Sequence, residues 1–224
     1  MIFALLPVKP PQEAKQRLRA VLSAEQRETL ARAMYEEVFA ALRAARGLDR
    51  IVVMTADAAT AEHARRHGAL VFDEPGLLGH RNSADRAARR AIGLGARTVL
   101  MLPIDVPLVT SAEIEELIAA ARPGVIVVPS FDGAGTNALV LTPPDAIESC
   151  FGENSFASHM EQARVKGVPV QVLRPPGILL DIDTPEDIAE LLARAPQSRI
   201  AALLRGEGSF QPSANSRQQQ AAKL

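Results

Sequence analysis

Several features are scarce or missing in this chain of 224 residues. It has no tryptophan and one tyrosine, and its single cysteine, Cys150, excludes an internal disulfide. The start of the chain lacks the basic region of a secretion signal, so a cytoplasmic location is expected. No apolar run approaches the roughly 20 residues of a membrane-spanning helix. A net charge of −1 gives no reason to expect nucleic acid or an anionic membrane as a partner.

Two common nucleotide-binding motifs are also absent. No GxxxxGK[ST] follows the first apolar run, which excludes a P-loop enzyme. No GxGxxG opens a helix there, so the dinucleotide fingerprint is missing. What remains is an ordinary globular composition, with 47% hydrophobic and 23% charged residues. A site for phosphates would therefore have to be built in another way.

Short apolar runs rich in β-branched residues predict strands, and helical segments lie between most of them. The predicted strands are 2–8, 50–56, 69–74, 98–104, 124–130, 137–143, 168–174 and 177–182. The clearest helix is 23–47, where Ser23 and Gln26 form a capping box and Gly47 follows the last turn. Thr110 and Glu113 repeat the capping pattern before a helix to about 122. Runs that are apolar throughout predict strands buried on both faces. We expect an α/β fold with an open, mostly parallel sheet, flanked by helices.

The chain is long enough for one domain with a sizeable core, which we expect over residues 1–205. Residues 206–224 are polar and rich in serine and glutamine, so they predict a disordered tail. The long helix has an apolar side that could serve a homodimer.

Charged residues gather where the predicted strands end, which is where open α/β sheets bind ligands. Cations follow the first strand, and carboxylates follow several of the others. The candidates are Lys9, Lys15, Arg17, Thr55, Asp57, Asp73, Asp105, Asp132, Asp181 and Asp183.

The segment Asp181-Ile182-Asp183 has two interpretations. It precedes Thr184 and Pro185, a good cap and first residue for a helix, and a carboxylate is favourable near a helix start. Capping explains Asp181 poorly, because this residue directly follows an apolar run. A divalent cation would offset the cost of desolvating the pair. From the residues alone, both interpretations stay open, as does a strand-ending role for Asp105.

Considered together, these residues outline a phosphoryl or nucleotidyl transfer site. Carboxylates without nearby His or Cys suit Mg²⁺ better than zinc. The cations after the first strand could neutralise a polyphosphate, although taken singly Lys15 could simply be solvated. His80 and His159 show no metal-ligand spacing, and Cys150 has no evident base beside it.

Five segments resemble the 2-phospho-L-lactate guanylyltransferase family, in order from about residue 3 to 192. They are LPVKPPQEAKQRL (6–18), PIDVPLV (103–109), DGAGTNAL (132–139), FGENSFASHMEQA (151–163) and LLDIDTPEDI (179–188). The resemblance implies a Rossmann-like nucleotidyltransferase fold and a place in coenzyme F-420 biosynthesis. It also implies that GMP from GTP is joined to phospholactate, phosphoenolpyruvate or 3-phosphoglycerate, and that pyrophosphate leaves.

The resemblance assigns roles by motif. It makes Asp105, Asp181 and Asp183 the ligands of Mg²⁺. It places the acceptor at Thr136, Gly152 and Ser155, and the GTP phosphates at Lys9, Lys15 and Arg17. The guanosine would lie near Thr55, Asp57, Asp73 and Asn82. One departure is His80-Arg81, where the family has apolar residues.

In the implied reaction, an oxygen of the acceptor phosphate attacks the α-phosphorus of GTP in line. No general base is needed, because this phosphate is already ionised at neutral pH. The alternatives are a related nucleotidyltransferase for a molybdopterin or sugar phosphate, or a nucleotide-binding module without turnover. The first loop lacks the glycine-rich pattern of those relatives, and all three aspartates are present, which disfavours a module that has lost its activity.

Overall fold

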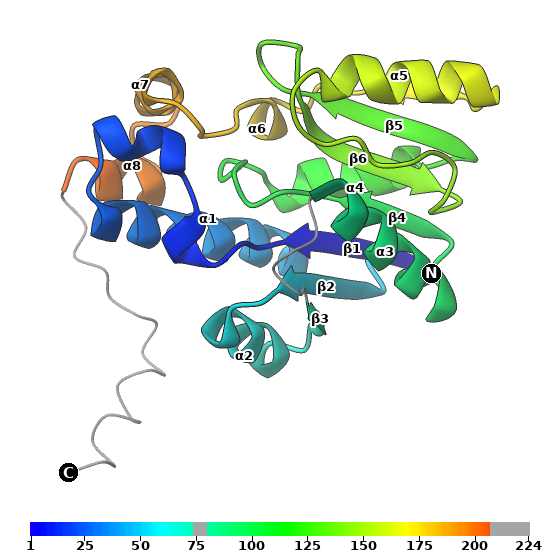
Figure 1. Cartoon of the computed structure of the whole chain (residues 1–224), viewed down its shortest axis with the longest axis horizontal. Helices are drawn as coiled ribbons and strands as arrows, with labels where there is room; N and C mark the ends of the chain where they lie inside the picture. Colours follow the sequence, from blue (N-terminus) through cyan, green and yellow to red (C-terminus); the bar gives the residue numbers. More distant parts are fainter. Residues whose placement is uncertain (74–79, 207–224) are drawn as a thin grey trace.

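The computed structural model describes residues 1–73 and 80–206, with the side chains of 80–82 left aside. Seven strands form one sheet in the order β3-β2-β1-β4-β6-β5-β7 (Figure 1). Their bounds are β1 Ile2–Pro7, β2 Arg50–Thr55, β3 Leu70–Asp73, β4 Thr98–Met101, β5 Gly124–Pro129, β6 Thr136–Thr142 and β7 Val170–Val172. The expected α/β class is confirmed, as are seven of the predicted strands.

One strand, β6, runs antiparallel to both of its neighbours, β4 and β5. The other strand pairs are parallel. A tight loop after β5 turns the chain back, and Pro129 stands opposite Thr136. Because of this reversal, β6 begins at the edge where β1, β4 and β5 end. The first residues of β6 therefore lie among those that follow the parallel strands.

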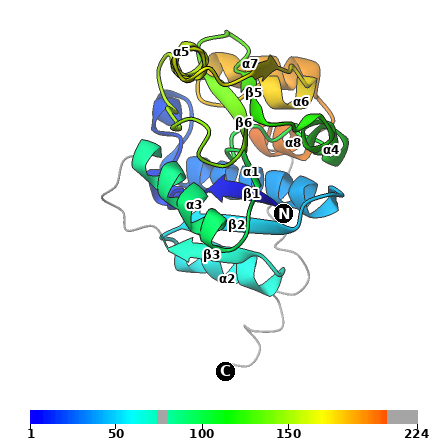
Figure 2. The same cartoon turned by 90° about the vertical axis from the view of Figure 1, so that its right-hand side faces the viewer.

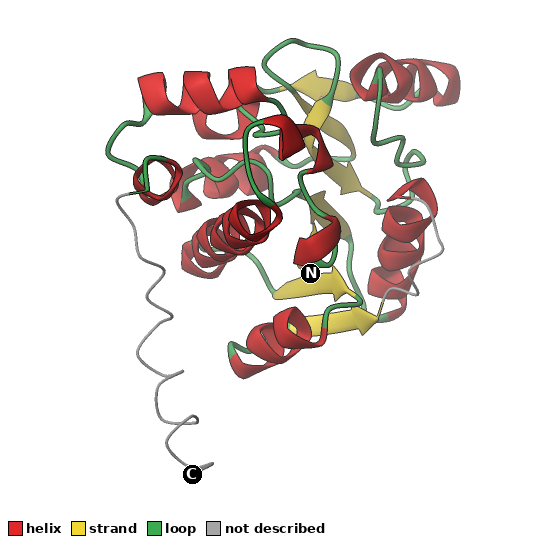
Figure 3. Cartoon of the chain, turned by 60° about the vertical axis from the view of Figure 1, so that its left-hand side comes forward, coloured by secondary structure: helices red, strands yellow, loops and turns green. Residues whose placement is uncertain are grey.

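Helices cover both faces of the sheet (Figures 2 and 3). Their bounds are α1 Ala24–Ala44, α2 Ala58–Arg66, α3 His80–Gly93, α4 Ser111–Ala120, α5 Ser155–Lys166, α6 Pro176–Leu179, α7 Pro185–Arg194 and α8 Arg199–Leu204, with short 3-10 helices η1 Pro11–Glu13 and η2 Gln16–Ala20. One core joins α1, α2 and α4 to the sheet, and a second joins α3 and α5 to the opposite face. A third core packs η2 against α1, α7 and α8. None of the described helices is long and apolar enough to cross a membrane.

The predicted capping boxes are present. Ser23 and Gln26 exchange hydrogen bonds at the start of α1, and Thr110 and Glu113 do so at the start of α4. Helix α1 ends at Ala44, so Gly47 lies slightly beyond it with a φ of 92°. These local signals therefore predicted both helix starts correctly.

The strand predicted at 177–182 is wrong. Residues 176–179 form the single helical turn α6, and the chain then passes through Asp181 without joining the sheet. Pro175 and Pro176 start this turn, since proline suits the first helical position and cannot donate to a strand ladder. The apolar residues of this segment are still buried, Ile178, Leu180 and Ile182 among them. The predicted tail lies outside the described residues from 207 onward.

Candidate functional site

Two loops bring the three predicted metal ligands to the edge of the sheet where β4 ends. Asp105 follows β4, and the backbone N–H of Ile182 donates to the carbonyl oxygen of Asp105 at 2.9 Å. This bond fastens the segment Asp181–Asp183 beside the loop after β4. Asp181 and Asp183 therefore lie close to the carboxylate of Asp105, although Asp105 is far from them along the chain.

Asn137, on β6, holds this segment from the other side. Its amide nitrogen lies 2.9 Å from the carbonyl oxygens of Ile178 and Leu179, and 3.1 Å from Oδ1 of Asp181. Because Asn137 is buried, these contacts fix both α6 and the carboxylate that follows it. Asn137 lies within the DGAGTNAL segment, but nothing in the sequence distinguishes it as a site residue.

Lys15 supplies the positive charge of this cluster. Its ammonium lies 2.8 Å from Oδ1 of Asp183 and 3.4 Å from Oδ2 of Asp105, and its side chain is only 6% exposed. Burial alone would lower the pKa of Lys15, but the charges of Asp105 and Asp183 outweigh it and raise this pKa. The backbone of Lys15 is left-handed, with a φ of 54°. Such strain in a residue other than glycine is common at functional sites.

The other two predicted cations are more exposed. Nη1 of Arg17 lies 3.8 Å from Oδ2 of Asp183, and its side chain is 76% exposed. Burial would raise the pKa of Asp183, but the charges of Lys15, Arg17 and Lys9 outweigh burial and lower it. Lys9 and Arg17 therefore face the cluster from the solvent side, while Lys15 lies inside it.

The electrostatics of Asp181 differ from those of Asp183. Burial, together with the charge of nearby Asp105, raises the pKa of Asp181 to about 6, against a smaller lowering by the hydrogen bond from Asn137. Asp181 is thus a half-buried carboxylate whose charge the protein's cations do not fully offset. Hard oxygen ligands with uncompensated charge suit a divalent cation such as Mg²⁺. Within residues 1–73 and 80–206, however, no set of three His, Cys, Asp or Glu side chains is already arranged to hold a metal ion.

The predicted acceptor residues meet on the opposite side of β6, beside α5. Oγ1 of Thr136 lies 3.0 Å from Nδ1 of His159, which is buried on the same helix as Ser155. Ser155 is the first residue of α5 and is 1% exposed, and its Oγ has no hydrogen-bond partner among the described residues. Gly152 has a φ of 122°, which favours glycine. The structure therefore brings these three residues to one helix start.

The predicted guanosine residues lie further along the same edge. Thr55 and Asp73 are register partners on β2 and β3, and Asp73 is exposed. Asp57 caps α2 by accepting from the N–H of Thr60 at 2.8 Å, so helix capping already accounts for this residue. The side chain of Asn82 lies outside the described residues.

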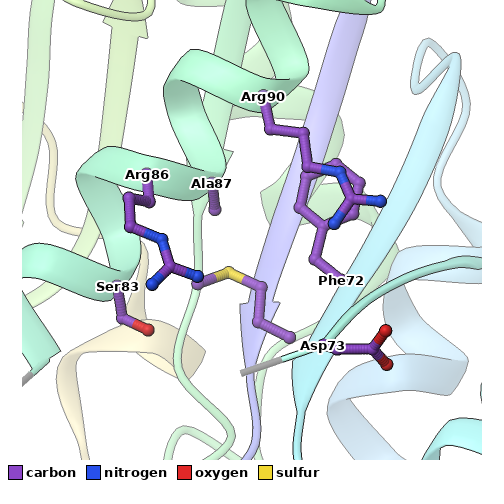
Figure 4. A pocket seen from close by; sticks show the side chains of 7 residues that line it. Phe72, Asp73, Ser83, Arg86, Ala87 and Arg90 are labelled. Atoms are coloured by element: carbon purple, nitrogen blue, oxygen red, sulfur yellow. The ribbon is translucent and has the colours of Figure 1, made fainter. Parts of the chain in front are cut away.

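A small pocket opens between α3 and the ends of β2 and β3 (Figure 4). The Arg90 guanidinium lies over the Phe72 ring, 4.0 Å from its centroid. The pocket is lined by Met54, Phe72, Asp73, Ser83, Arg86, Ala87 and Arg90. Asp73 was predicted from its place after a strand, whereas Arg86 and Arg90 were not, because only the fold shows which face of α3 points toward the sheet.

Curated proteins resemble this chain over most of its length. A phosphoenolpyruvate guanylyltransferase from Sphaerobacter thermophilus is 42% identical over 198 residues, which cover 87% of this chain and 94% of that protein. A 3-phospho-D-glycerate guanylyltransferase from Colwellia psychrerythraea is 36% identical, over 84% of this chain and 90% of that protein.

Solved structures share the fold at low sequence identity. The 4-diphosphocytidyl-2C-methyl-D-erythritol synthase of Anaerococcus prevotii has a TM-score of 0.60 at 10% identity, over 88% of this chain and 99% of that one. A Mycobacterium tuberculosis protein solved in complex with manganese has a TM-score of 0.55 at 20% identity, over 86% and 98% of the two chains. The family model described as "Guanylyl transferase CofC like" matches residues 2–221, and the chain therefore belongs to this guanylyltransferase family.

Proposed function

We propose that this protein joins GMP from GTP to a small phosphorylated three-carbon acid and releases pyrophosphate, as a step of coenzyme F-420 biosynthesis. The candidate acceptors are phosphoenolpyruvate, 3-phosphoglycerate and 2-phospho-L-lactate. The relatives named above support the first two, and the family resemblance supports the third. A cytoplasmic location and a homodimer remain expectations from the sequence.

One observation carries this proposal. Thr136 and Asn137 are consecutive residues at the start of β6, and their side chains contact different clusters. Thr136 contacts His159 beside the buried start of α5, and Asn137 contacts Asp181 in the carboxylate cluster. The candidate cation site and the candidate anion site thus adjoin at one strand end. A phosphorylated acid, which carries a phosphate and a carboxylate a few bonds apart, suits such a pair of sites.

At the carboxylate cluster, Asp105, Asp181 and Asp183 would hold Mg²⁺. The bound ion would neutralise charge on the phosphate oxygens and orient them. Asn137 keeps Asp181 in position, and Lys15 keeps Asp183 ionised. Lys9 and Arg17, on the solvent side, would take up charge on the β- and γ-phosphates of GTP.

At the start of α5, the acceptor carboxylate would bind. Ser155 offers a buried hydroxyl without a partner among the described residues, and Thr136 offers a second hydroxyl. The start of a twelve-residue helix also favours an anion. With its carboxylate held there, the acceptor would present its phosphate toward the aspartates.

The nucleoside would lie along the edge toward β2 and β3. The pocket between α3 and Phe72 combines an apolar floor with the carboxylate of Asp73 at its border (Figure 4). A carboxylate can accept hydrogen bonds from the N–H groups of guanine, whereas cytosine and uracil lack that pair of donors. We therefore assign Asp73 to the base and Thr55, its register neighbour, to the same region.

The reaction would then consist of one in-line displacement. An oxygen of the acceptor phosphate forms a bond to the α-phosphorus of GTP, the bond from this phosphorus to the bridging oxygen breaks, and pyrophosphate leaves with that electron pair. The protein's contribution is positioning and charge neutralisation. No side chain needs to take up a proton, because the acceptor phosphate is already ionised.

The experiment measures pyrophosphate release from GTP with each of the three acids, and with a sugar phosphate and a molybdopterin as alternative acceptors. We expect release with at least one three-carbon acid and none with the alternatives. The same assay with ATP, CTP and UTP tests the nucleotide, and we expect GTP to be preferred. Release with a sugar phosphate or molybdopterin alone would move the protein to a related nucleotidyltransferase. Nucleotide binding without release under any combination would favour a binding module.

A further inference from the structure

His159 lies at the centre of a buried hydrogen-bond chain that the reaction described above does not use. It is fully buried on α5, one turn beyond Ser155, so the two side chains share the face that packs on the sheet. One ring nitrogen, Nδ1, lies 3.0 Å from Oγ1 of Thr136. The other, Nε2, lies 2.8 Å from the backbone nitrogen of Cys150. The imidazole thus connects β6 to the loop that contains Gly152.

These two contacts determine which ring nitrogen carries the proton. A backbone N–H can only donate, so Nε2 must accept from Cys150 and cannot carry a hydrogen itself. A neutral imidazole with a bare Nε2 carries its hydrogen on Nδ1. Nδ1 therefore donates to Thr136, and Oγ1 of Thr136 is the acceptor in that bond.

This assignment orients the Thr136 hydroxyl. Its oxygen accepts from His159, and its own hydrogen remains available to donate in another direction. With the opposite tautomer, Thr136 would have to donate to His159 and would present only lone pairs to an anion. A carboxylate accepts hydrogen bonds and is repelled by lone pairs. The tautomer of His159 thus decides whether Thr136 attracts or repels an anion.

We propose that His159 is a positioning residue that holds the Thr136 hydroxyl as a hydrogen-bond donor toward the carboxylate of the acceptor. This inference rests on the proposed acceptor site. It is based on two hydrogen bonds. The bond from Cys150 fixes the tautomer of His159, and the bond to Thr136 makes the Thr136 oxygen an acceptor, so that its hydroxyl hydrogen can point to the anion. His159 does not touch the acceptor and transfers no proton.

The loop that locks the tautomer is itself anchored. Asp85, on α3, accepts from the backbone N–H of Ser149 at 2.8 Å and from the Ser149 hydroxyl at 2.7 Å. The Gln162 amide, on α5, contacts the Cys150 sulfur. The Cys150 N–H is therefore held in place by contacts with two helices, α3 and α5. It stays in position to donate to Nε2 of His159 and so fixes the tautomer.

Two substitutions each remove one of the two hydrogen bonds of His159 and keep the other. In His159→Asn, the short side chain can place its NH₂ near the Nδ1 position and donate to Thr136, but Cys150 loses its acceptor. In His159→Gln, the longer side chain can place its carbonyl near the Nε2 position and accept from Cys150, but Thr136 loses its donor. Each variant thus keeps one of the two hydrogen bonds in the same cavity, and each serves as the control for the other.

The measurement is the KM for the acceptor and the KM for GTP in both variants, after thermal unfolding has shown that both are folded. We expect His159→Gln to raise the KM for the acceptor by about 3- to 10-fold, the effect of one weakened hydrogen bond, with the KM for GTP unchanged. We expect His159→Asn to stay closer to the wild type. Equal acceptor KM values in the two variants, or a larger rise in His159→Asn, would overturn the proposal.

A second measurement does not depend on activity. The ¹⁵N chemical shifts of the imidazole, assigned by the signals lost in His159→Gln, report which ring nitrogen carries the hydrogen. We expect hydrogen on Nδ1, and hydrogen on Nε2 would overturn the proposal even if the KM values agreed with it. If the wild type released no pyrophosphate with any acceptor, the proposed function would fail separately, and the tautomer result would still test the positioning role of His159.

Discussion

The ammonium of Lys15 lies 2.8 Å from Oδ1 of Asp183, a residue 168 positions further along the chain. It also lies 3.4 Å from Asp105, so a single buried cation bridges two of the three aspartates. Within the described part of the chain Asp181 has no ion pair with a cation, and burial together with the charge of Asp105 raises its pKa. The cluster is therefore electrostatically incomplete on one side, which is the property that a divalent cation would correct.

Replacing Lys15 by methionine removes this bridging charge while keeping a chain of similar length. Removing one partner of a fully buried ion pair costs roughly 3–5 kcal/mol. We expect a smaller loss here, because the side chains of Asp105 and Asp183 are 25% and 36% exposed. We also expect Mg²⁺ to raise the unfolding temperature more in Lys15→Met than in the wild type, because the ion replaces the lost charge.

Lys9→Met is the matched control, since Lys9 is exposed and its replacement should change the unfolding temperature little. Thermal unfolding with and without Mg²⁺ measures both effects. An identical response to Mg²⁺ in Lys15→Met and the wild type would mean that the ion does not bind where the ammonium lies.

The raised pKa of Asp181 predicts a pH limit for metal binding. With a pKa of about 6, Asp181 is protonated below that pH and ionised above it, while the pKa of Asp183 is lowered. Metal ligands must be deprotonated, so Mg²⁺ affinity should weaken as the pH falls through 6, by about tenfold per unit for one proton. Calorimetric titration of Mg²⁺ between pH 5 and 8 tests this, and a constant affinity would contradict it.

Asn137→Ala should move that limit. The hydrogen bond from Asn137 lowers the pKa of Asp181, so its loss should raise this pKa and shift the pH midpoint of Mg²⁺ binding upward. The variant also leaves the carbonyls of Ile178 and Leu179 without this donor, which should cost roughly 1–3 kcal/mol in unfolding free energy. Urea unfolding measures the second effect. A destabilised variant with an unchanged pH midpoint would show that Asn137 supports the fold without influencing Asp181.

Arg17→Ala tests the proposed phosphate contacts. The guanidinium is 76% exposed and only 3.8 Å from Asp183, so it is free to reach a bound triphosphate. Losing one charged hydrogen bond should raise the KM for GTP by about tenfold and leave the KM for the acceptor almost unchanged. Arg19→Ala, in the same 3-10 helix, is the control. Similar kinetics in the two variants would make Arg17 an ordinary surface charge.

Local patterns in the sequence predicted much of this fold. Apolar runs marked seven strands, and capping boxes marked the starts of α1 and α4, because these signals act over a few residues. The prediction of a strand at 177–182 is wrong because a buried segment needs apolar residues in any conformation, so its composition alone does not distinguish a strand from a turn of helix. Pro175 and Pro176 and the Asn137 side chain decide its structure. Of these, only the prolines adjoin the segment in the sequence, whereas Asn137 is about 40 residues away.

Most residues of the candidate site could be predicted from the sequence, but the hydrogen bonds that connect them could not. The order of strands brings Lys15 and Asp105 to one edge, as expected, because they follow the neighbouring strands β1 and β4. Asp181 reaches this edge on a loop instead, which is bonded to Asp105 through Ile182 and to Asn137. The antiparallel direction of β6 was not expected, and it is what brings Asn137 and Thr136 to the same edge. The role of His159 could not be predicted, because it depends on a backbone N–H nine residues away and on a hydroxyl of another element.

Pyrophosphate release by Asp181→Asn at saturating Mg²⁺, with GTP and the preferred acid, tests the central claim most directly. Asparagine resembles the protonated aspartate that burial already favours, so the variant should fold with at least wild-type stability. If Asp181 holds the catalytic cation, losing a stabilisation of several kcal/mol should slow release by about 100-fold or more. A folded Asp181→Asn variant that releases pyrophosphate at a rate comparable to the wild type would contradict the account.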